Sequence, residues 1–150
     1  VATIRSGFFL RGLTGTAHEL CPKVKVLEMT DPIPNDRDPD NVSIEKTAPN
    51  QAFLYRLSND LNPLHVDPEQ AGGFDKPILH GLCTMGIAAR SLHDTYFDND
   101  CMRLKDLSVR FTSHVFPGET LQLESWKVDA STILFQAKVL EREGVICLKG

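Results

Sequence analysis

The segment from Pro77 to Leu92, PILHGLCTMGIAARSL, constrains the fold more than any other part of the chain. Its apolar residues recur at helical spacing, and the resulting helix is apolar on nearly every side, which is typical of a helix in a protein interior. Glycine inside a helix costs roughly 0.5–1 kcal/mol relative to alanine. Gly81 and Gly86 therefore indicate either close approach by another segment or a backbone N–H kept clear for a ligand. The stripe expected to face the core is Ile78, Leu82, Met85, Ala89 and Leu92.

The residues after this helix alternate between apolar and polar side chains, with the period of two that half-buried strands have. The alternation runs through residues 107–111, 121–126, 133–139 and 145–148, and turns are predicted at Pro117-Gly118 and Gly144. Strands joined by short turns pair in antiparallel fashion. An antiparallel sheet that follows a buried helix predicts an α+β domain.

A proline-rich stretch separates the N-terminal part of the chain from the rest. Residues 31–40, DPIPNDRDPD, hold three of the nine prolines. Because proline fixes φ and lacks an N–H, this stretch should be an extended, irregular loop. Strands are predicted before it, at residues 4–10 and 23–29, and a short helix after it, at residues 51–58. About forty residues rarely hold a core alone, so we expect one domain over residues 1–150, with residues 1–46 as a lead-in segment.

Composition and simple motifs exclude several classes of protein. The 16 Lys and Arg against 20 Asp and Glu give a net charge of −4, which offers no basic surface for nucleic acid or an anionic membrane. No apolar run is long enough to span a bilayer. The four cysteines form no CxxC pair, so we expect reduced thiols and no metal site. The patterns GxGxxG, GxxxxGK(S/T) and GxSxG are absent, which argues against nicotinamide, P-loop and α/β-hydrolase sites. The scattered histidines His18, His93 and His114 are expected to be surface or core residues.

The densest polar cluster between apolar segments is the hexapeptide DLNPLH, which runs from Asp60 to His65. The Asn62-Pro63 pair favours a turn, so the carboxylate and the imidazole on either side of it can converge on one point. One group can then give a proton while the other takes one. Composition alone equally allows a plain surface turn, because Asp, Asn and Pro are common turn formers.

A second candidate lies at the start of the predicted helix. The N–H of Gly81, which follows His80, would sit at the positive end of the helix dipole, where a developing oxyanion is stabilised. Alone, this pair also fits a histidine near a helix cap and a glycine selected for packing. Together, an acid–base turn and an anion site are what the addition of water to an α,β-unsaturated thioester requires, because attack at C3 forms an enolate and C2 must then receive a proton.

The turn and its surroundings resemble a known family. The motif D-x-N-P-L-H from Asp60 to His65, with Ala71 six positions on, resembles the hydratase 2 motif of the MaoC-like (R)-specific enoyl-CoA hydratases. The similarity continues through GFDKPILHGLCT at residues 73–84, RF at residues 110–111 and FPGETL at residues 116–121. Residues 23–26 and the loop near residues 33–40 resemble the form found in eukaryotic peroxisomal multifunctional enzymes. The resemblance covers about residues 23–148.

The resemblance implies a hot-dog fold, with an antiparallel sheet wrapped around the central helix at residues 77–92. It implies reversible hydration of trans-2-enoyl-CoA to (3R)-hydroxyacyl-CoA in fatty acid β-oxidation, with no cofactor, since coenzyme A is part of the substrate. Asp60 and His65 would be a catalytic pair that holds one water, with His65 as base and Asp60 as acid, or the reverse. The N–H of Gly81 would bind the thioester oxygen, and Asn62 and His80 would belong to the substrate site.

The chain also departs from that family. Asn59 stands where the family usually has glycine, and the loop between His65 and Gly73 is about two residues shorter than in the eukaryotic form. Eukaryotic members carry two hot-dog units, and this chain resembles the second unit with its lead-in. We therefore expect a homodimer or a missing partner half. The resemblance implies a peroxisomal location, although the final tripeptide Leu148-Lys149-Gly150 is not a peroxisomal address; without such an address the location would be cytoplasmic.

Two alternative functions stay open at this point. A hot-dog thioesterase also binds acyl-CoA but hydrolyses the thioester, and it would not need the Asp60–His65 turn. A non-catalytic acyl-CoA-binding fragment would tolerate the loss of Asp60 or His65, yet both residues are present.

Overall fold

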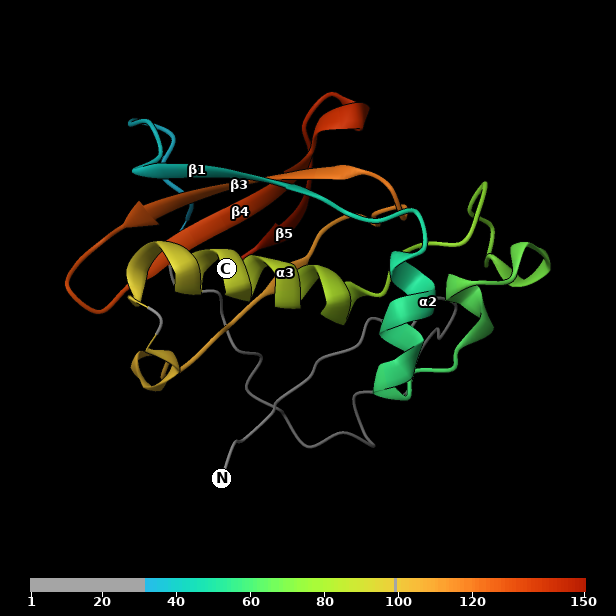
Figure 1. The fold of residues 1–150 in the computed structure, drawn as a ribbon. Helices are drawn as coiled ribbons and strands as arrows, with labels where there is room; N and C mark the ends of the chain where they lie inside the picture. The colour runs from blue at the N-terminus through green and yellow to red at the C-terminus, as the bar shows by residue number, and fades with distance from the viewer. Residues whose placement is uncertain (1–31, 99) are drawn as a thin grey trace, which may run out of the picture. The chain divides into compact units, whose positions relative to one another are not determined.

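An antiparallel sheet and one long helix dominate the computed structural model, which describes residues 32–98 and 100–150 (Figure 1). The five strands lie in the order β1-β3-β4-β5-β2. Their bounds are β1 Asn41–Lys46, β2 Arg110–Phe111, β3 Thr120–Lys127, β4 Ile133–Val139 and β5 Val145–Lys149. The α-helices are α2 Gln51–Tyr55 and α3 Gly81–Tyr96, and short 3₁₀ turns are η1 Arg56–Ser58, η2 Pro63–His65, η3 Pro68–Gln70, η4 Cys101–Arg103 and η5 Leu140–Arg142.

The centre of the sheet confirms the alternation predicted from the sequence. In the β3–β4 pair, Leu121 lies opposite Val139 and Leu123 opposite Ala137. These four side chains are fully or almost fully buried on the face that carries the core. The predicted strand at residues 107–111 is shorter in the structure, where only the two residues of β2 pair with β5.

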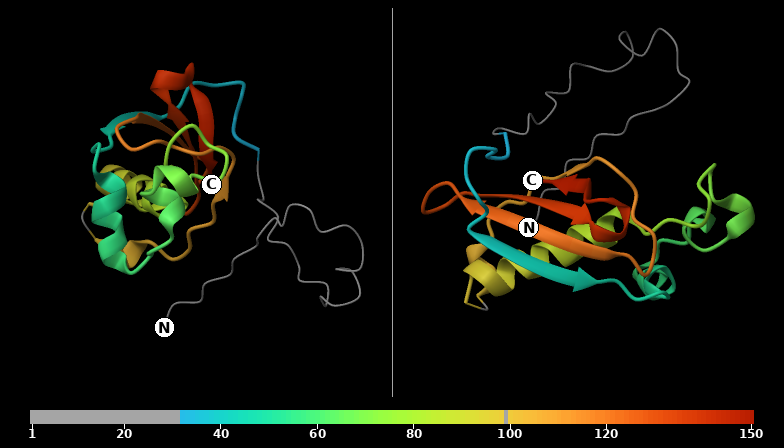
Figure 2. Two further views of the ribbon diagram at one scale, coloured as in Figure 1. Left: turned by 90° about the vertical axis from the view of Figure 1, so that its right-hand side faces the viewer. Right: turned by 90° about the horizontal axis from the view of Figure 1, so that it is seen from above.

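Helix α3 lies across one face of the sheet, as the hot-dog arrangement requires (Figures 1 and 2). It begins at Gly81 and ends at Tyr96, whereas the sequence predicted residues 77–92. The reason is a tertiary hydrogen bond: the N–H of Leu79 donates to the carbonyl of Val115 at 2.7 Å. His80 then adopts the extended φ/ψ of an N-cap, −58° and 131°, so the residues before Gly81 cannot be helical.

The side of α3 that faces the core differs from the predicted stripe. Leu82, which was expected to be buried, is 53% exposed. The helix is therefore covered by the sheet on one side and exposed on the other, so the expected interior position holds for one side of the helix only. The buried helix residues are Cys83, Thr84, Ala88, Ser91 and Leu92.

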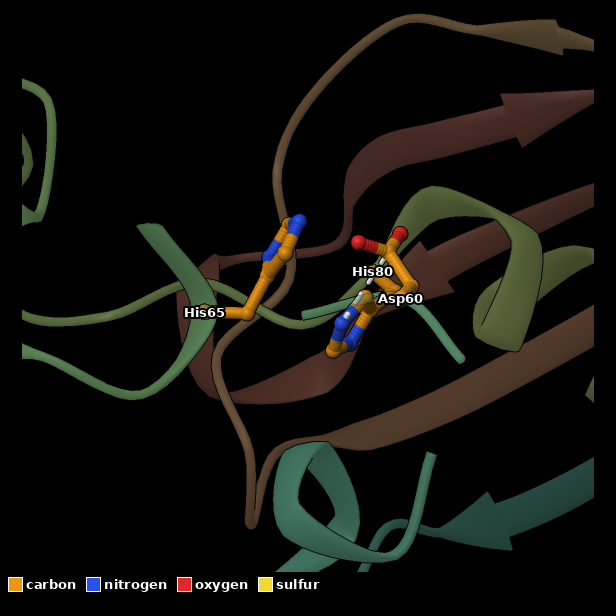
Figure 3. A group of neighbouring side chains, drawn as sticks. All are labelled: Asp60, His65 and His80. Carbon is orange, nitrogen blue, oxygen red and sulfur yellow. Dashed lines mark ion pairs between the residues drawn. The ribbon is translucent and has the colours of Figure 1, made fainter. Parts of the chain in front are cut away.

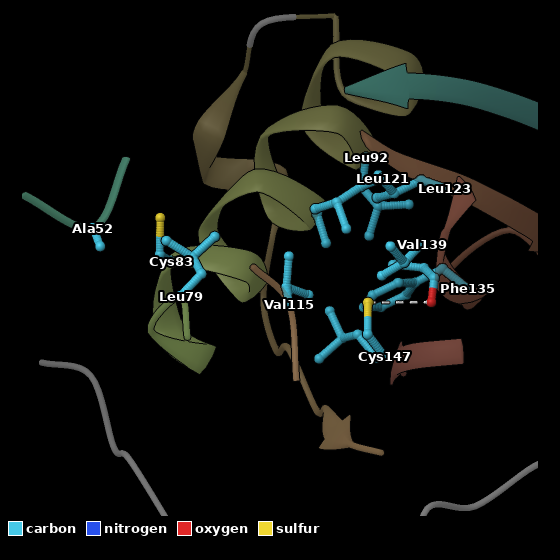
Figure 4. Packing of buried hydrophobic residues seen from close by; sticks show 13 residues of the cluster. Ala52, Leu79, Cys83, Leu92, Val115, Leu121, Leu123, Phe135, Val139 and Cys147 are labelled. Carbon is cyan, nitrogen blue, oxygen red and sulfur yellow. Dashed lines mark hydrogen bonds between the residues drawn. The ribbon is translucent and has the colours of Figure 1, made fainter. Parts of the chain in front are cut away.

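The core between α3 and the sheet is closely packed and apolar (Figure 4). Phe135 from β4 and Leu148 from β5 meet Leu92 and Ala88 of the helix in one cluster. Burying such side chains contributes about 1.5–3 kcal/mol each, which makes this layer the main source of stability. Cys83 is a buried free thiol, and burial raises its pKa, which disfavours the reactive thiolate.

Several other predictions meet the structure with different outcomes. The irregular loop is confirmed for residues 32–40, and the short helix at residues 51–58 is confirmed as α2 followed by η1. The lead-in was expected to extend to residue 46, but residues 41–46 form β1, which pairs with β3 from Asn41 opposite Ser125 to Lys46 opposite Thr120. The predicted strands at residues 4–10 and 23–29, together with His18, lie outside the described residues. None of the helices in the described part is long and apolar enough to cross a membrane.

Candidate active site

The turn that carries Asp60 is held by its own side chains and by a left-handed residue. Asn59 ends η1 with φ +71°, which reverses the chain just before Asp60. Asn tolerates this conformation better than most residues, so it can replace the glycine usual in the family. The N–H of Asn62 donates to Oδ1 of Asp60 at 3.2 Å, and the guanidinium of Arg56 donates to the carbonyl of Leu61 at 3.1 Å. The Asp60 side chain stays 43% exposed, so one carboxylate oxygen remains available.

Asn62 shapes the next step of the turn. Its Oδ1 accepts a hydrogen bond from the N–H of Leu64 at 3.1 Å, which caps the 3₁₀ turn η2. Pro63 occupies the first position of that turn, where the missing N–H costs nothing. His65 is the last residue of η2, so the Asn-Pro pair sets the direction of the imidazole relative to Asp60.

The ring of His65 is oriented by a backbone carbonyl. Its Nδ1 lies 2.7 Å from the carbonyl oxygen of Ile78. Because a carbonyl oxygen only accepts hydrogen bonds, Nδ1 carries the proton in this contact. In the neutral ring Nε2 is then left with a free lone pair, which is the state needed to accept a proton.

His80 lies against His65 and brings a second imidazole to the site (Figure 3). The two rings stack with centroids 3.7 Å apart and planes 28° apart, and the ring of Tyr55 lies 4.5 Å from His80 on another side. His80 is only 1% exposed, and neither of its ring nitrogens has a hydrogen-bond partner in the described part of the chain. Burial, and then the neighbouring His65, hold the pKa of His80 below its usual value, so this ring is neutral at neutral pH.

The N-terminus of α3 opens onto a cavity beside His65. The cavity has a volume of about 320 Å³, and both His65 and Gly81 line it. Gly81 is the first residue of the helix, where backbone N–H groups have no acceptor in the helix itself. A Cβ at Gly81 would lie 3.2 Å from the ring of Phe111, so glycine allows Phe111 to close one wall of the cavity against the start of the helix.

Asp60, His65 and His80 offer possible metal-ligand atoms within 4.8 Å of one another. A zinc ion would need the lone pairs of both rings to meet about 2.0–2.1 Å from each nitrogen. Imidazole lone pairs lie in the ring plane, and two rings stacked with only 28° between their planes point them side by side. One ring would have to turn before both could bind one ion. The arrangement instead suits a small hydrogen-bonded molecule such as water.

The structure brings together most of the residues predicted from the sequence. Asp60, His65 and His80 gather in one place, and Gly81 shares the cavity with His65. Asn62 lies in the same turn. His80 was expected in the substrate site, but it is buried behind His65 and does not line the cavity.

Two residues near the site were missed by sequence reasoning. Tyr55 packs on His80, and burial raises the pKa of its hydroxyl. His114, expected to be an ordinary surface or core residue, lines the same cavity as His65. Nothing in the local sequence around His114 signals this, because the contact depends on how the segment before β3 crosses the start of α3.

The fold and site define a class: a hot-dog domain in which Asp60, His65 and His80 lie together and His65 shares a cavity with the first residue of the central helix. Comparison with known families agrees, because the MaoC like domain matches residues 31–146. The chain belongs to the MaoC-like domain family.

The chain is similar to several known proteins. It is 50% identical over 140 residues to a "Probable enoyl-CoA hydratase 2" of Dictyostelium discoideum, a match that covers 91% of this chain and 46% of that protein. It is 53% identical over 116 residues to the "Peroxisomal multifunctional enzyme type 2" of Mus musculus, covering 76% of this chain and 16% of that protein. Among solved structures, a MaoC-like dehydratase from Phytophthora capsici aligns with a TM-score of 0.76 and 49% identity, over 79% of this chain and 40% of that one. The chain thus spans less than half the length of each of these relatives.

Proposed function

We propose that this protein is an (R)-specific 2-enoyl-CoA hydratase, a hydro-lyase that adds water reversibly to trans-2-enoyl-CoA and forms (3R)-hydroxyacyl-CoA. One observation carries the proposal: Asp60 and His65 converge from two sides of the Asn-Pro turn, and His65 shares a cavity with Gly81 at the start of α3. The names of the relatives support the same reaction, since they include the "Probable enoyl-CoA hydratase 2" of Dictyostelium discoideum and the "Enoyl-CoA hydratase 2, peroxisomal" of Arabidopsis thaliana.

In the proposed mechanism the carboxyl group of Asp60 starts with a proton, Nε2 of His65 starts without one, and the two groups bind one water between them. Nε2 of His65 takes a proton from the water, and the hydroxide adds to C3 of the enoyl thioester. The electron pair moves to the thioester oxygen as an enolate. Asp60 then delivers its proton to C2, and the proton on His65 returns to Asp60, which closes the cycle. The contact between Nδ1 of His65 and the Ile78 carbonyl supports His65 as the base, because it leaves Nε2 unprotonated.

The N–H of Gly81 is the proposed donor to the enolate oxygen. A helix N-terminus favours negative charge, and α3 extends over 16 residues behind this N–H. Removing one such donor from an oxyanion site typically costs about 10²–10³ in kcat. No cofactor is proposed, because coenzyme A is part of the substrate.

His80 and Asn62 are proposed as positioning residues. His80 supports the face of the His65 ring and places Nε2 4.0 Å from Oδ2 of Asp60, so a small movement would form a hydrogen bond that orients the carboxyl group. Asn62 caps η2 and thereby sets the separation of Asp60 and His65. The resemblance placed both residues in the substrate site; their packing favours this indirect role.

Thioester hydrolysis is the less favoured function. It requires attack at the carbonyl carbon and release of the thiol, and no relative named above is called a thioesterase. A carboxylate–imidazole pair poised for proton exchange at adjacent carbons suits hydration better.

The test is the hydration of crotonyl-CoA, followed as the loss of enoyl absorbance, with chiral analysis of the product. We expect the 3R product, and about 10²–10⁴-fold lower kcat for Asp60→Asn and for His65→Gln. A matched control is the pair at the far end of α3, where Nδ1 of His93 lies 3.3 Å from Oδ1 of Asp94. His93→Gln and Asp94→Asn should keep full activity. Release of free thiol, or unchanged rates for the Asp60 and His65 variants, would contradict the proposal.

The chain is proposed to act as the second, catalytic half of a double hot-dog hydratase, or as a homodimer. Large apolar side chains are exposed around the site: Leu57 and Leu61 flank Asp60 in sequence, Leu82 follows Gly81, and Phe111 packs on Gly81. Such a surface is typical of an interface. Light scattering should give about twice the chain mass of 16.7 kDa for a homodimer. A fully active monomer would contradict the need for a second unit.

The names of relatives from mouse and Arabidopsis thaliana support a peroxisomal location.

A further inference from the structure

His114 forms part of the cavity wall, together with Phe111 and Val115 from the same segment. Its ring lies between two aromatic rings, 4.8 Å from Phe74 and 4.8 Å from Phe116. The proposed reaction does not use this ring, since the base, the acid and the oxyanion donor are all assigned elsewhere. The polar ring of His114 therefore lies in a largely apolar wall without a role in the proposed proton transfers.

A partly buried ion pair determines which nitrogen of His114 carries the proton. Arg142 binds the buried Glu119, with Nε 2.8 Å from Oε1, and its guanidinium also donates to the carbonyl oxygen of His114. A second guanidinium nitrogen lies 3.2 Å from Nε2 of His114. Arginine has only donors, so Nε2 must be the acceptor and must be unprotonated. The neutral ring then carries its proton on Nδ1.

The same contacts keep the ring neutral. Burial, and then the neighbouring charge of Arg142, hold the pKa of His114 below its usual value. No hydrogen bond joins its Nδ1–H to any of residues 32–98 and 100–150. His114 thus presents an uncharged hydrogen-bond donor beside a cavity whose other wall residues include Phe74, Ile78 and Phe111.

We infer that His114 is a specificity-determining residue whose Nδ1–H donates a hydrogen bond to an oxygen of the bound acyl-CoA, away from the reacting carbons. The inference rests on the proposed function for the identity of the ligand. A plain hydrocarbon chain would leave this donor unpaired, whereas a carbonyl or hydroxyl oxygen would satisfy it. Two parts of an acyl-CoA can supply such an oxygen: an amide carbonyl of the pantetheine arm, or an oxygen substituent on the acyl chain.

The test compares two substitutions of nearly equal size. His114→Leu removes the donor, whereas His114→Asn keeps an N–H close to the position of Nδ1. Dissociation constants are measured by calorimetry for butyryl-CoA, which is saturated and unreactive, and for an ω-hydroxyacyl-CoA. Since binding is measured without turnover, the result stands apart from the proposed reaction, which the hydration of crotonyl-CoA by the unmodified protein tests separately. His93→Leu, at the far end of α3, is the control.

We expect His114→Leu to weaken binding about three- to tenfold, the range for one neutral hydrogen bond, and His114→Asn to restore most of it. Weaker binding of both ligands assigns the contact to the pantetheine arm, since the butyryl chain carries no oxygen beyond the thioester. Weaker binding of the ω-hydroxyacyl-CoA alone assigns it to the acyl chain. Unchanged binding of both ligands to His114→Leu would overturn the inference. Equal losses in the Leu and Asn variants would also overturn it, because they would reflect the lost aromatic packing alone.

Discussion

Replacing His80 by phenylalanine should make the protein more stable and less active. The ring is 1% exposed, and both of its nitrogens lack hydrogen-bond partners in the described part of the chain. Each unsatisfied buried polar atom costs about 1–3 kcal/mol. Phenylalanine keeps the ring that stacks on His65 and Tyr55 and removes both nitrogens. Because the larger apolar ring also introduces some crowding, we expect a net gain in the free energy of unfolding of about 1–3 kcal/mol.

The catalytic effect should have the opposite sign. Nε2 of His80 is 4.0 Å from Oδ2 of Asp60, and phenylalanine removes any orienting hydrogen bond to that carboxyl group. A misplaced acid costs roughly 10–100-fold in kcat. KM should change little, since His80 does not line the cavity.

Urea unfolding followed by the fluorescence of the buried Trp126, the single tryptophan, measures the stability change. Steady-state hydration of crotonyl-CoA gives kcat and KM. His93→Phe, a substitution of the same type at the last turn of α3, should alter stability by no more than about 0.5 kcal/mol. The reasoning is refuted if His80→Phe lowers the free energy of unfolding, or if its kcat equals that of the unmodified protein.

Four further outcomes are expected. Asn59→Val should lose about 1–2 kcal/mol in urea unfolding because φ is +71°, whereas Asn59→Gly should change stability by only a few tenths of a kcal/mol; equal losses would contradict strain at this residue. Gly81→Ala should lower kcat roughly 10-fold or more, because its Cβ would lie 3.2 Å from the Phe111 ring; an unchanged kcat would contradict the tight fit. Folding lowers the pKa values of His80 and His114 below 6.5, so as the pH falls the unfolded chain binds protons before the folded protein does. The contribution of these two histidines to the free energy of unfolding should therefore be complete above pH 6.5 and be lost as the pH drops through 6.5 towards the lower folded-state pKa values. Urea midpoints measured from about pH 7.5 to about pH 5.5 would show this loss. Dialysis against EDTA should leave kcat unchanged, and a loss that zinc reverses would contradict the geometric argument against a metal.

Local patterns predicted much of the fold. The alternation at residues 121–126 and 133–139 identified β3 and β4 because one face of each strand is buried and the side-chain period is two. The Asp60–His65 motif predicted the turn because proline and asparagine act on their immediate neighbours. In both cases the determining contacts lie within a few residues.

Long-range contacts explain what the sequence could not predict. The start of α3 moved from Pro77 to Gly81 because Leu79 pairs with Val115, far away in the chain. The buried side of α3 was misassigned at Leu82 because only the position of the sheet decides which side is covered. The place of His114 depends on Arg142, 28 residues further on, and no local periodicity encodes such a pair.

The central claim is that the carboxyl group and the imidazole of the turn hold one water between them and act on the same side of the double bond, so that the hydroxyl at C3 and the proton at C2 are added to one face. Hydration of crotonyl-CoA in D₂O, with the product analysed by proton NMR, tests this directly. The account predicts a single 3R diastereomer in which deuterium at C2 and the new hydroxyl at C3 have been added to the same face. Addition to opposite faces, or a mixture of configurations at C2, would contradict it.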